Sequence, residues 1–455
     1  MSAVVEGHAA ASALPLLAHA DASRVFAWAR GRAIDIGEFL ADVHATAALL
    51  PAGDAVNLCE DRYAFLVAFC AVACRGHANL LPASRAPQAV AETLRAYPGS
   101  HALVDADLPT PGAHGRRIDV PLIPAEQVVV IGFTSGSTGK PKPHVKRWAS
   151  FAASNAHNIA AFGALIDFAA TPLAHVVATV PPQHMYGTEL SVVLPLLGPF
   201  SVHASRPLFP ADVAATLAAV PSPRVLVTTP VHLAALLREG GELPALAAIT
   251  SATAPLPREL AAAAEARYGA PVLELFGSTE TCVIAQRRCA HGEDWRLHPG
   301  VSLRPQPDGT FVDASWFEQA ITLADLVELL PEQRFRLCGR HADLVEIAGK
   351  RASLAELTRR IAALPGVEDA IALQLDDVDA AGVRRIAALV VAPTRCETEL
   401  LQELRTSIDA AFLPRPLRKV VALPRNETGK LPRAALLAMI GDAGGTRVAR
   451  SALPD

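Results

Sequence analysis

The chain has 455 residues, which is enough for one large domain and a second, smaller one. Its 41 basic and 45 acidic residues leave a net charge of −4, so it lacks the basic balance by which proteins bind nucleic acid. It has no apolar run of about 18 residues and no N-terminal signal segment, which predicts a cytoplasmic protein without a membrane span.

Strands and helices are predicted to alternate as far as residue 276. Apolar residues at helical spacing predict helices at 36–50, 63–74, 148–165, 232–238 and 258–268. Short apolar runs predict strands at 55–59, 101–104, 128–133, 175–180, 224–228, 247–250 and 272–276. This alternation is typical of an α/β fold in which parallel sheets are covered by helices on both faces.

The strand at 128–133 runs into a loop of small polar residues. The loop comprises Thr134, Ser135, Gly136, Ser137, Thr138, Gly139 and Lys140. Its backbone N–H groups, hydroxyls and ammonium suit a polyphosphate, which the glycines allow to approach closely. The Walker pattern does not fit, because its first Gly and final Ser/Thr are replaced by Thr134 and Pro141. An ordinary surface turn is the alternative, although such a turn needs no lysines at 140, 142 and 146.

Lysine is rare in this chain, so its positions carry information. Only six lysines stand among the 41 basic residues, and three of them lie in or beside the loop. An ammonium acts as a compact point charge toward phosphate. The other three, at 350, 419 and 430, indicate that the last quarter of the chain also meets the phosphates or the reacting carboxylate.

Three more loops follow predicted strands, at the ends where α/β sheets bind ligands. They read PPQHMYG at 181–187, SATAP at 251–255 and FGSTET at 276–281. In the last of them, Glu280 offers a carboxylate oxygen to Mg²⁺ and Thr279 offers a hydroxyl to a phosphate oxygen. The alternatives are a helix cap for the Ser-Thr-Glu segment and a core or capping role for His184.

Together these segments resemble the signature motifs of the adenylate-forming superfamily. Its members are acyl- and aryl-CoA synthetases, carrier-protein ligases, nonribosomal-peptide adenylation domains and luciferases. The resemblance implies that the loop from Thr134 to Lys140 holds the ATP phosphates and that Glu280 binds Mg²⁺ beside Thr279. It also implies an adenine site at Thr253 and Phe276. It implies an acyl pocket bordered by His184, Tyr186, Gly187, Ser251 and Gly277.

The last quarter of the chain carries the family's remaining motifs. The resemblance implies ribose contacts by Asp325 and Arg340, a hinge at Asp343 and a catalytic lysine at Lys430, in LPRNETGKLPR. On its own, Asp325 reads as a helix N-cap and Lys430 as a solvated turn residue. Helices are predicted at 354–364 and 397–412, and strands at 344–347, 370–375, 386–391 and 419–423. We therefore expect an N-terminal domain at 1–339 and a small mobile α+β domain at 340–455.

The chain departs from the family pattern at several positions. Pro143 and His144 replace a small residue and an apolar one, and Thr253 stands where the family more often has Gly. Phe276 replaces the usual Tyr, and Ala324 replaces the Gly that usually precedes the ribose aspartate.

The resemblance implies an AMP-forming ligase with ATP and Mg²⁺ as cofactors. A small carboxylic acid attacks the α-phosphate of ATP, which gives an acyl-adenylate and pyrophosphate, while Lys430 bridges the carboxylate and the phosphate. A phosphopantetheine thiol, of an acyl carrier protein or of CoA, then attacks the adenylate.

The SGSTGKPKPHVK loop and the IAGKR turn look most similar to ligases of aryl-polyene (xanthomonadin-type) pigment clusters. That similarity implies a hydroxybenzoate-like acid and a carrier-protein partner. A CoA synthetase and a non-catalytic nucleotide-binding protein are the alternatives. A serine hydrolase is excluded because no GxSxG elbow is present.

Overall fold

The computed structural model describes residues 12–19, 21–82, 84–110, 112–134, 142–340, 344–347, 350–378, 384–426 and 429–442. Residues 1–302 with 313–321 pack as one compact unit, and residues 303–312 with 322–455 pack as a second. These units are defined by how residues pack. The boundary predicted at residue 340 instead separates a domain that moves from one that does not, and it stays a prediction. No helix within the described ranges is both long and apolar enough to cross a membrane.

The larger sheet of the first unit confirms the predicted α/β fold. Its strand order is β16-β15-β14-β13-β12-β10-β11-β2-β3. Neighbours from β14 to β2 are parallel, whereas β15, β16 and β3 are antiparallel to their neighbours. The bounds are β2 Val25–Ala29, β3 Arg32–Asp35, β10 Ala174–Ala178, β11 Phe200–His203, β12 Arg224–Thr228, β13 Ala248–Ser251, β14 Val272–Ser278, β15 Cys282–Arg287 and β16 Trp295–Leu297.

The smaller sheet of this unit has the order β6-β4-β5-β8-β9. Its strands pair in parallel except for β8 and β9, which form an antiparallel hairpin. The bounds are β4 Ala55–Asn57, β5 Asn79–Leu81, β6 His101–Leu103, β8 Val128–Thr134 and β9 Lys142–Arg147. A separate antiparallel pair joins β1 (Ala13–Pro15) to β7 (Leu122–Pro124).

Helix α2 (Arg62–Cys74) packs between the two sheets. Its residues are buried from the first to the last but one, and they share one apolar core with Val129 of β8 and Val176 of β10. A helix that is apolar on all sides must be buried, which explains its sequence. The other helical segments that precede α7 are α1 Ile36–Leu49, α3 Pro87–Ala96, η1 Asp105–Asp107, α4 Trp148–Gly163, α5 Met185–Thr188, the π-helical η2 Glu189–Val193 and α6 Leu194–Leu197. Of these, α3 packs against the other face of the smaller sheet.

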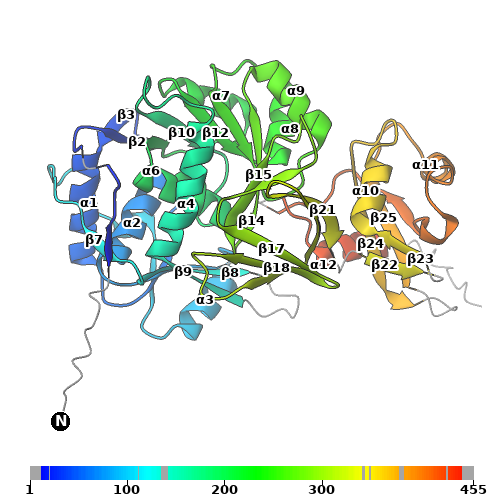
Figure 1. The fold of residues 1–455 in the computed structure, drawn as a ribbon, viewed down its shortest axis with the longest axis horizontal. Helices are drawn as coiled ribbons and strands as arrows, with labels where there is room; N and C mark the ends of the chain where they lie inside the picture. The colour runs from blue at the N-terminus through cyan, green and yellow to red at the C-terminus, as the bar shows by residue number, and fades with distance from the viewer. Residues whose placement is uncertain are drawn as a thin grey trace, which may run out of the picture. The chain divides into compact units, whose positions relative to one another are not determined.

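The opposite face of the larger sheet is covered by α7 (Pro210–Ala218), α8 (Pro230–Glu239) and α9 (Arg258–Tyr268). Figure 1 shows α8 and α9 side by side, in green. Alternate residues of a strand face opposite sides, and β10 follows this rule. Val176 belongs to the core around α2, whereas Val177 belongs to the core beneath α7, α8 and α9.

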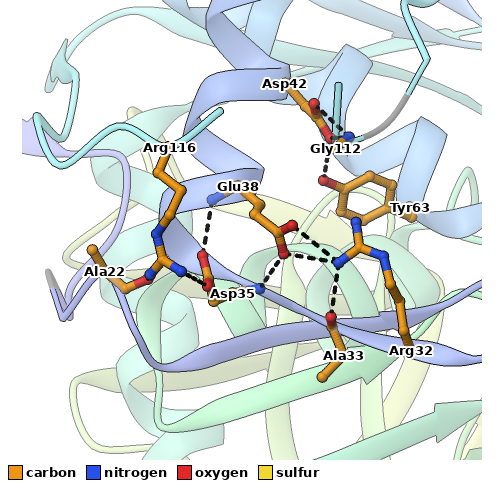
Figure 2. A network of polar contacts seen from close by, with 9 residues as sticks. All are labelled: Ala22, Arg32, Ala33, Asp35, Glu38, Asp42, Tyr63, Gly112 and Arg116. Carbon is orange, nitrogen blue, oxygen red and sulfur yellow. Dashed lines mark hydrogen bonds and ion pairs between the residues drawn. The ribbon is translucent and has the colours of Figure 1, made fainter. Parts of the chain in front are cut away.

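Helix α1 is anchored by a polar network at its start and along one side (Figure 2). Asp35 caps the helix by accepting the Glu38 N–H at 2.9 Å, and Arg116 pairs with the Asp35 carboxylate. The buried Asp42 accepts the Tyr63 hydroxyl at 2.7 Å and the Gly112 N–H at 2.9 Å. This network ties the segment near 112–116 to α1 and is separate from the candidate site.

The second unit contains two hairpins and a small sheet covered by helices. Hairpin β20–β21 and hairpin β22–β23 are antiparallel, and β24 pairs antiparallel with β25, which pairs in parallel with β26. The bounds are β20 Asp325–Leu330, β21 Arg334–Arg340, β22 Leu344–Ile347, β23 Lys350–Ser353, α10 Leu354–Ala362, β24 Asp369–Val378, β25 Arg384–Val391, α11 Glu397–Leu404, η4 Ala410–Phe412, β26 Leu417–Lys419 and α12 Arg433–Asp442. A further three-stranded sheet is formed by β17 (Val301–Gln306), β18 (Gly309–Ala314) and β19 (Ile321–Leu323).

Two predicted elements near the C-terminus are wrong in their bounds. The helix predicted at 397–412 ends at Leu404, because Asp409 starts a separate 3₁₀ turn by accepting the Ala411 N–H at 3.0 Å. In place of the strand predicted at 419–423, β26 covers Leu417–Lys419, since it pairs with β25 through Leu417 and Ala388. Pairing between strands decided this register, and the local sequence does not contain it.

Candidate active site

Strand β8 carries the start of the predicted phosphate loop. It ends at Thr134, and β9 returns antiparallel from Lys142, so Thr134 and Lys142 are register partners. Thr134 Oγ1 lies 3.0 Å from His144 Nε2 on β9. The predicted residues from Ser135 to Lys140 lie outside the described part of the chain. The described residues therefore include β8 and β9, the two strands that flank the predicted phosphate loop.

The FGSTET segment forms the tight turn between β14 and β15. Gly277 pairs with Val283, and Ser278 pairs with Cys282 across the turn. The buried Thr281 holds the turn closed, because its hydroxyl accepts the Ser278 N–H at 3.1 Å and donates to the Cys282 carbonyl at 2.8 Å. The segment is a hairpin turn rather than a helix start, so the helix-cap alternative is wrong.

The phosphate-loop hairpin and this turn meet, although they lie far apart in the sequence. His144 Nε2 lies 3.4 Å from a carboxylate oxygen of Glu280. Lys146 donates from Nζ to the Glu280 carbonyl. A Cβ added to Gly132 of β8 lies only 3.0 Å from the Thr279 methyl, so glycine makes room for Thr279. The structure thus brings Thr134, Thr279 and Glu280 to one place.

Glu280 is held in its ionised form. Burial opposes ionisation, but hydrogen bonding from Ser278, together with the nearby Lys146 charge, lowers the pKa of Glu280 below its ordinary value. Burial also lowers the pKa of His144, so its imidazole is neutral at neutral pH. An anionic carboxylate beside a neutral imidazole is suited to binding a hard cation.

A polar wall lines the carboxyl ends of the parallel strands β10, β12 and β13. The buried Tyr186 hydroxyl lies 2.9 Å from Thr250 Oγ1, next to the predicted pocket residue Ser251. The Thr179 hydroxyl lies 3.0 Å from both Thr228 Oγ1 and His232 Nδ1. These strand ends are neighbours in the sheet, and because successive residues of a strand face opposite sides, their polar side chains are shared between its two faces.

Other predicted pocket residues lie in or next to the elements that follow these strands. His184 is the residue before α5, and Gly187 lies within α5. A Cβ at Gly187 meets the Pro181 carbonyl oxygen at 2.0 Å, so the chain passes too close there for any other residue. Gly277 has the same constraint, because its Cβ meets the Cys282 carbonyl oxygen at 2.2 Å.

The predicted adenine residues lie at the ends of β13 and β14. Thr253 has a φ of +78°, a left-handed conformation that costs a β-branched residue energy. This is the position at which the family more often has glycine, and the backbone geometry gives the physical reason. The Phe276 ring packs against Trp295 with a centroid distance of 5.4 Å.

Three predicted residues belong to the second unit. Asp325 and Arg340 are register partners across the β20–β21 hairpin, so the two predicted ribose residues lie side by side. Asp325 starts a strand, which makes its helix-cap alternative wrong. Lys430 lies exposed in a tight turn, in which Gly429 has a φ of +78°. The predicted hinge Asp343 lies outside the described residues.

The Lys430 turn is held by contacts that use its backbone. The Lys430 N–H donates to Asn426 Oδ1 at 2.9 Å, and the Lys430 carbonyl accepts the Asn426 N–H at 2.8 Å. Arg425 donates to the Gly429 carbonyl at 3.0 Å and to both Asp369 carboxylate oxygens at 2.9 and 2.8 Å. The turn is therefore fastened to the start of β24.

Three residues lie beside the turn between β14 and β15 in places that sequence reasoning does not predict. His144 was noted only as a departure from the family, yet it bridges Thr134 and Glu280. Lys146 was singled out by the scarcity of lysine, but its position against Glu280 was not foreseen. Glu189, buried behind the turn, had one available signal, which is a carboxylate in an otherwise apolar run.

The donor set around Glu280 fits a magnesium ion that binds together with phosphates. Within the described ranges, no group of three or more His, Cys, Asp or Glu residues gathers to hold a metal by itself. Mg²⁺ is commonly bound by one or two carboxylates, with substrate phosphates and water completing its shell. One ionised carboxylate next to the hairpin of a phosphate loop matches that requirement.

Comparison with known proteins agrees with this arrangement. The family profile "AMP-binding enzyme" matches residues 18–308. A 4-coumarate–CoA ligase of Rhodobacter capsulatus is 30% identical over 69% of this chain and 78% of its own length. A sulfoacetate–CoA ligase of Cupriavidus necator is 28% identical over 72% of this chain and 70% of its own length.

Solved structures share the fold at low sequence identity. ATP-bound MatB from Rhodopseudomonas palustris has a TM-score of 0.75 at 20% identity, covering 93% of this chain and 97% of its own. The o-succinylbenzoate–CoA synthetase of Bacillus subtilis, in complex with ATP and magnesium ion, has a TM-score of 0.76 at 17% identity, covering 93% and 99%. The family profile covers more than half of this chain, so the chain belongs to the AMP-binding enzyme family of acid-adenylating ligases.

Proposed function

We propose that this ligase adenylates an aryl acid, such as a hydroxybenzoate, and transfers the acyl group to the phosphopantetheine thiol of an acyl carrier protein. The observation that carries the choice of acid is the polar wall at the ends of β10, β12 and β13. Ser251 Oγ is buried there, and among the described residues it has no hydrogen-bond partner. A buried hydroxyl left unpaired is costly, so a ligand hydroxyl at this place gains affinity.

Similarity to named enzymes supports an aromatic acid. Two relatives, from Rhodobacter capsulatus and Halorhodospira halophila, are 4-coumarate–CoA ligases at 30% and 29% identity. 4-Coumarate is an aromatic acid with a phenolic hydroxyl. The sequence resemblance to aryl-polyene pigment ligases indicates the same class of acid.

In adenylation the substrate carboxylate is the nucleophile, so the protein contributes positioning of the reactants and neutralisation of charge. We assign the phosphates of ATP to the Thr134–Lys140 loop and to Thr279, and the adenine to Phe276 and Thr253. Asp325 and Arg340 hold the ribose, and Lys430 neutralises charge as the carboxylate attacks the α-phosphate. Mg²⁺ bound at Glu280 supplies further neutralisation of the phosphate oxygens.

The C-terminal part is proposed to change position between the two half-reactions. Asp343 is the hinge in this proposal, and residues 340–455 are the part that moves. Such a motion removes Lys430 after adenylation and admits the thiol. Measuring the distance between labels on the two parts, with and without acyl-adenylate, tests the motion.

The acceptor has two candidates. The proposal that the acceptor is a carrier protein rests on the resemblance of the phosphate loop and the IAGKR turn to pigment-cluster ligases. Free CoA is the second candidate, because the named relatives are CoA ligases. Thioester formation with equal concentrations of CoA and of a holo-carrier protein separates the two.

Pyrophosphate exchange across a panel of acids tests the choice of substrate. Hydroxybenzoates are expected to support exchange at least ~10-fold better than benzoate or alkyl acids of similar size. In the Ser251→Ala variant, the ratio of the exchange rate with hydroxybenzoate to the exchange rate with benzoate is expected to fall toward one. Faster exchange with alkyl acids refutes the aryl assignment, and no exchange with any acid refutes the ligase reaction.

A further inference from the structure

Two buried ionisable side chains form hydrogen bonds with the backbone of the turn between β14 and β15. Lys146 of β9 is 5% exposed, and Glu189 of the π-helical segment η2 is 2% exposed. Lysine and glutamate are almost never buried to this extent without a specific partner. Glu189 also stands in a run of apolar residues, where a Leu or Val is the cheaper choice.

The two side chains hold opposite sides of the turn. Lys146 Nζ donates to the carbonyl of Glu280, at the tip of the turn. The carboxylate oxygens of Glu189 accept the Val283 N–H at 3.2 and 3.1 Å, at the start of the returning strand. The Ser154 hydroxyl of α4 donates to the same carboxylate at 3.2 Å. The turn is therefore fastened to β9, to η2 and to α4.

The turn needs to be held, because its backbone is strained. Cys282 has a φ of +61°, which residues other than glycine rarely adopt, and its carbonyl group lies close to Gly277. Strained conformations persist only when the surrounding structure determines them, and they gather at functional sites. The π-helical turn that carries Glu189 is itself a rare element that is frequent at functional sites.

Stability alone does not explain this choice of residues. Buried charges pay a desolvation cost that well-packed apolar residues avoid, so they are poor stabilisers. What they provide is a fixed direction, through hydrogen bonds to chosen backbone groups, of which the one from the Lys146 ammonium is charge-assisted. Here the chosen groups, the Glu280 carbonyl and the Val283 N–H, lie on either side of the strained residue.

We propose that Lys146 and Glu189 are positioning residues that hold the 278–283 turn in the shape that presents the Glu280 carboxylate to Mg²⁺. This inference rests on the proposed metal role of Glu280. Neither residue touches the metal in this proposal, and each acts through the backbone of the turn. Their loss weakens the use of Mg²⁺ more than it weakens the fold.

The experiment compares matched full-length variants by calorimetry. Glu189→Gln removes the ionisable carboxyl group and Lys146→Met removes the ammonium, each with little change in size. Glu274→Gln is the control, because Glu274 is also buried (3% exposed), accepts the Leu256 N–H at 2.9 Å and pairs with Arg287, away from the turn. ATP binding is titrated at several Mg²⁺ concentrations, and Tm is measured with and without MgATP.

Removing a partner of a metal-binding group typically costs 10–100-fold in metal affinity. We expect Glu189→Gln and Lys146→Met to raise the Mg²⁺ concentration needed for ATP binding by ~10-fold or more. Glu274→Gln is expected to lower Tm and to keep the wild-type Mg²⁺ requirement. If either of the first two fails to fold, Ser154→Ala leaves Lys146 and Glu189 in place and is expected to shift the requirement in the same direction by a smaller factor.

An unchanged Mg²⁺ requirement in the folded variants overturns the positioning role, and so does an equal change in Glu274→Gln. A separate result bears on the function itself. If the wild type and Glu280→Gln bind ATP with the same dependence on Mg²⁺, the metal role of Glu280 falls, whatever the other variants do.

Discussion

Replacing Lys430 by alanine separates the two half-reactions. The structure indicates that the turn survives the change, because Lys430 contacts Asn426 through its backbone and Arg425 bonds the Gly429 carbonyl. The side chain is exposed, so truncating it is expected to change the free energy of unfolding by no more than about 0.5 kcal/mol. A loss of activity much larger than this reports on chemistry rather than on folding.

The expected loss follows from what the ammonium does. If it bridges the carboxylate and the α-phosphate as charge develops, its contact is made chiefly in the transition state. Losing one such preorganised donor costs about 10²–10³ in rate, or roughly 3–4 kcal/mol. ATP binding is expected to change little, because the phosphate loop, Asp325 and Arg340 remain.

Two assays on the same variant provide the measurement. One follows thioester formation from acid and ATP, and the other follows it from synthetic acyl-adenylate. Lys430→Ala is expected to be slow in the first and close to wild type in the second. Equal losses in both refute the assignment, because they show that Lys430 supports the thiol step or the fold instead.

Four further predictions concern the first unit. Glu280→Gln is expected to abolish pyrophosphate exchange while Tm stays near that of the wild type; unchanged exchange removes Glu280 from the metal site. His184→Ala is expected to raise KM for the acid far more than KM for ATP, and parallel changes in both constants mean a structural role. Thr253→Gly relieves a left-handed φ of +78° at the cost of added chain entropy, so urea unfolding is expected to show a gain of about 0.5–1 kcal/mol. A loss of stability there shows that the Thr253 side chain contributes more than its strain costs. Burial raises the pKa of Glu189 from 4.5 to about 7, with Lys146 and Cys282 facing it, so the native state binds the proton more tightly than the unfolded state. The stability that this proton confers is complete below pH 4.5 and is lost as the pH rises through 7, by about 3 kcal/mol in all. Urea midpoints from pH 5 to 8 are expected to fall in the wild type relative to Glu189→Gln, and a constant difference contradicts the titration.

The sequence by itself indicated the type of the clearly periodic elements, and it proposed where the site lies. Apolar runs and helical spacing depend on neighbours a few residues apart, which is why β8, β12 and β14 lie where they were predicted. Loops rich in Gly, Ser and Thr after buried strands mark ligand-binding ends for an equally local reason. The cross-strand pairing of Asp325 with Arg340 is consistent with the common ribose role that their motifs predicted.

Only the tertiary structure decided which of these residues touch. Thr134 and Glu280 are linked through His144 because the hairpin of one sheet packs against a turn of the other, and no local pattern records that contact. In the sequence Glu189 is only a carboxylate in a run of apolar residues, and the packing of η2 against β15 is what brings it to the Val283 N–H. The end of α11 and the register of β26 depended likewise on partners distant in the chain. Contacts of this kind are set by the packing of whole elements, whereas sequence periodicity reports only which face of each element is apolar.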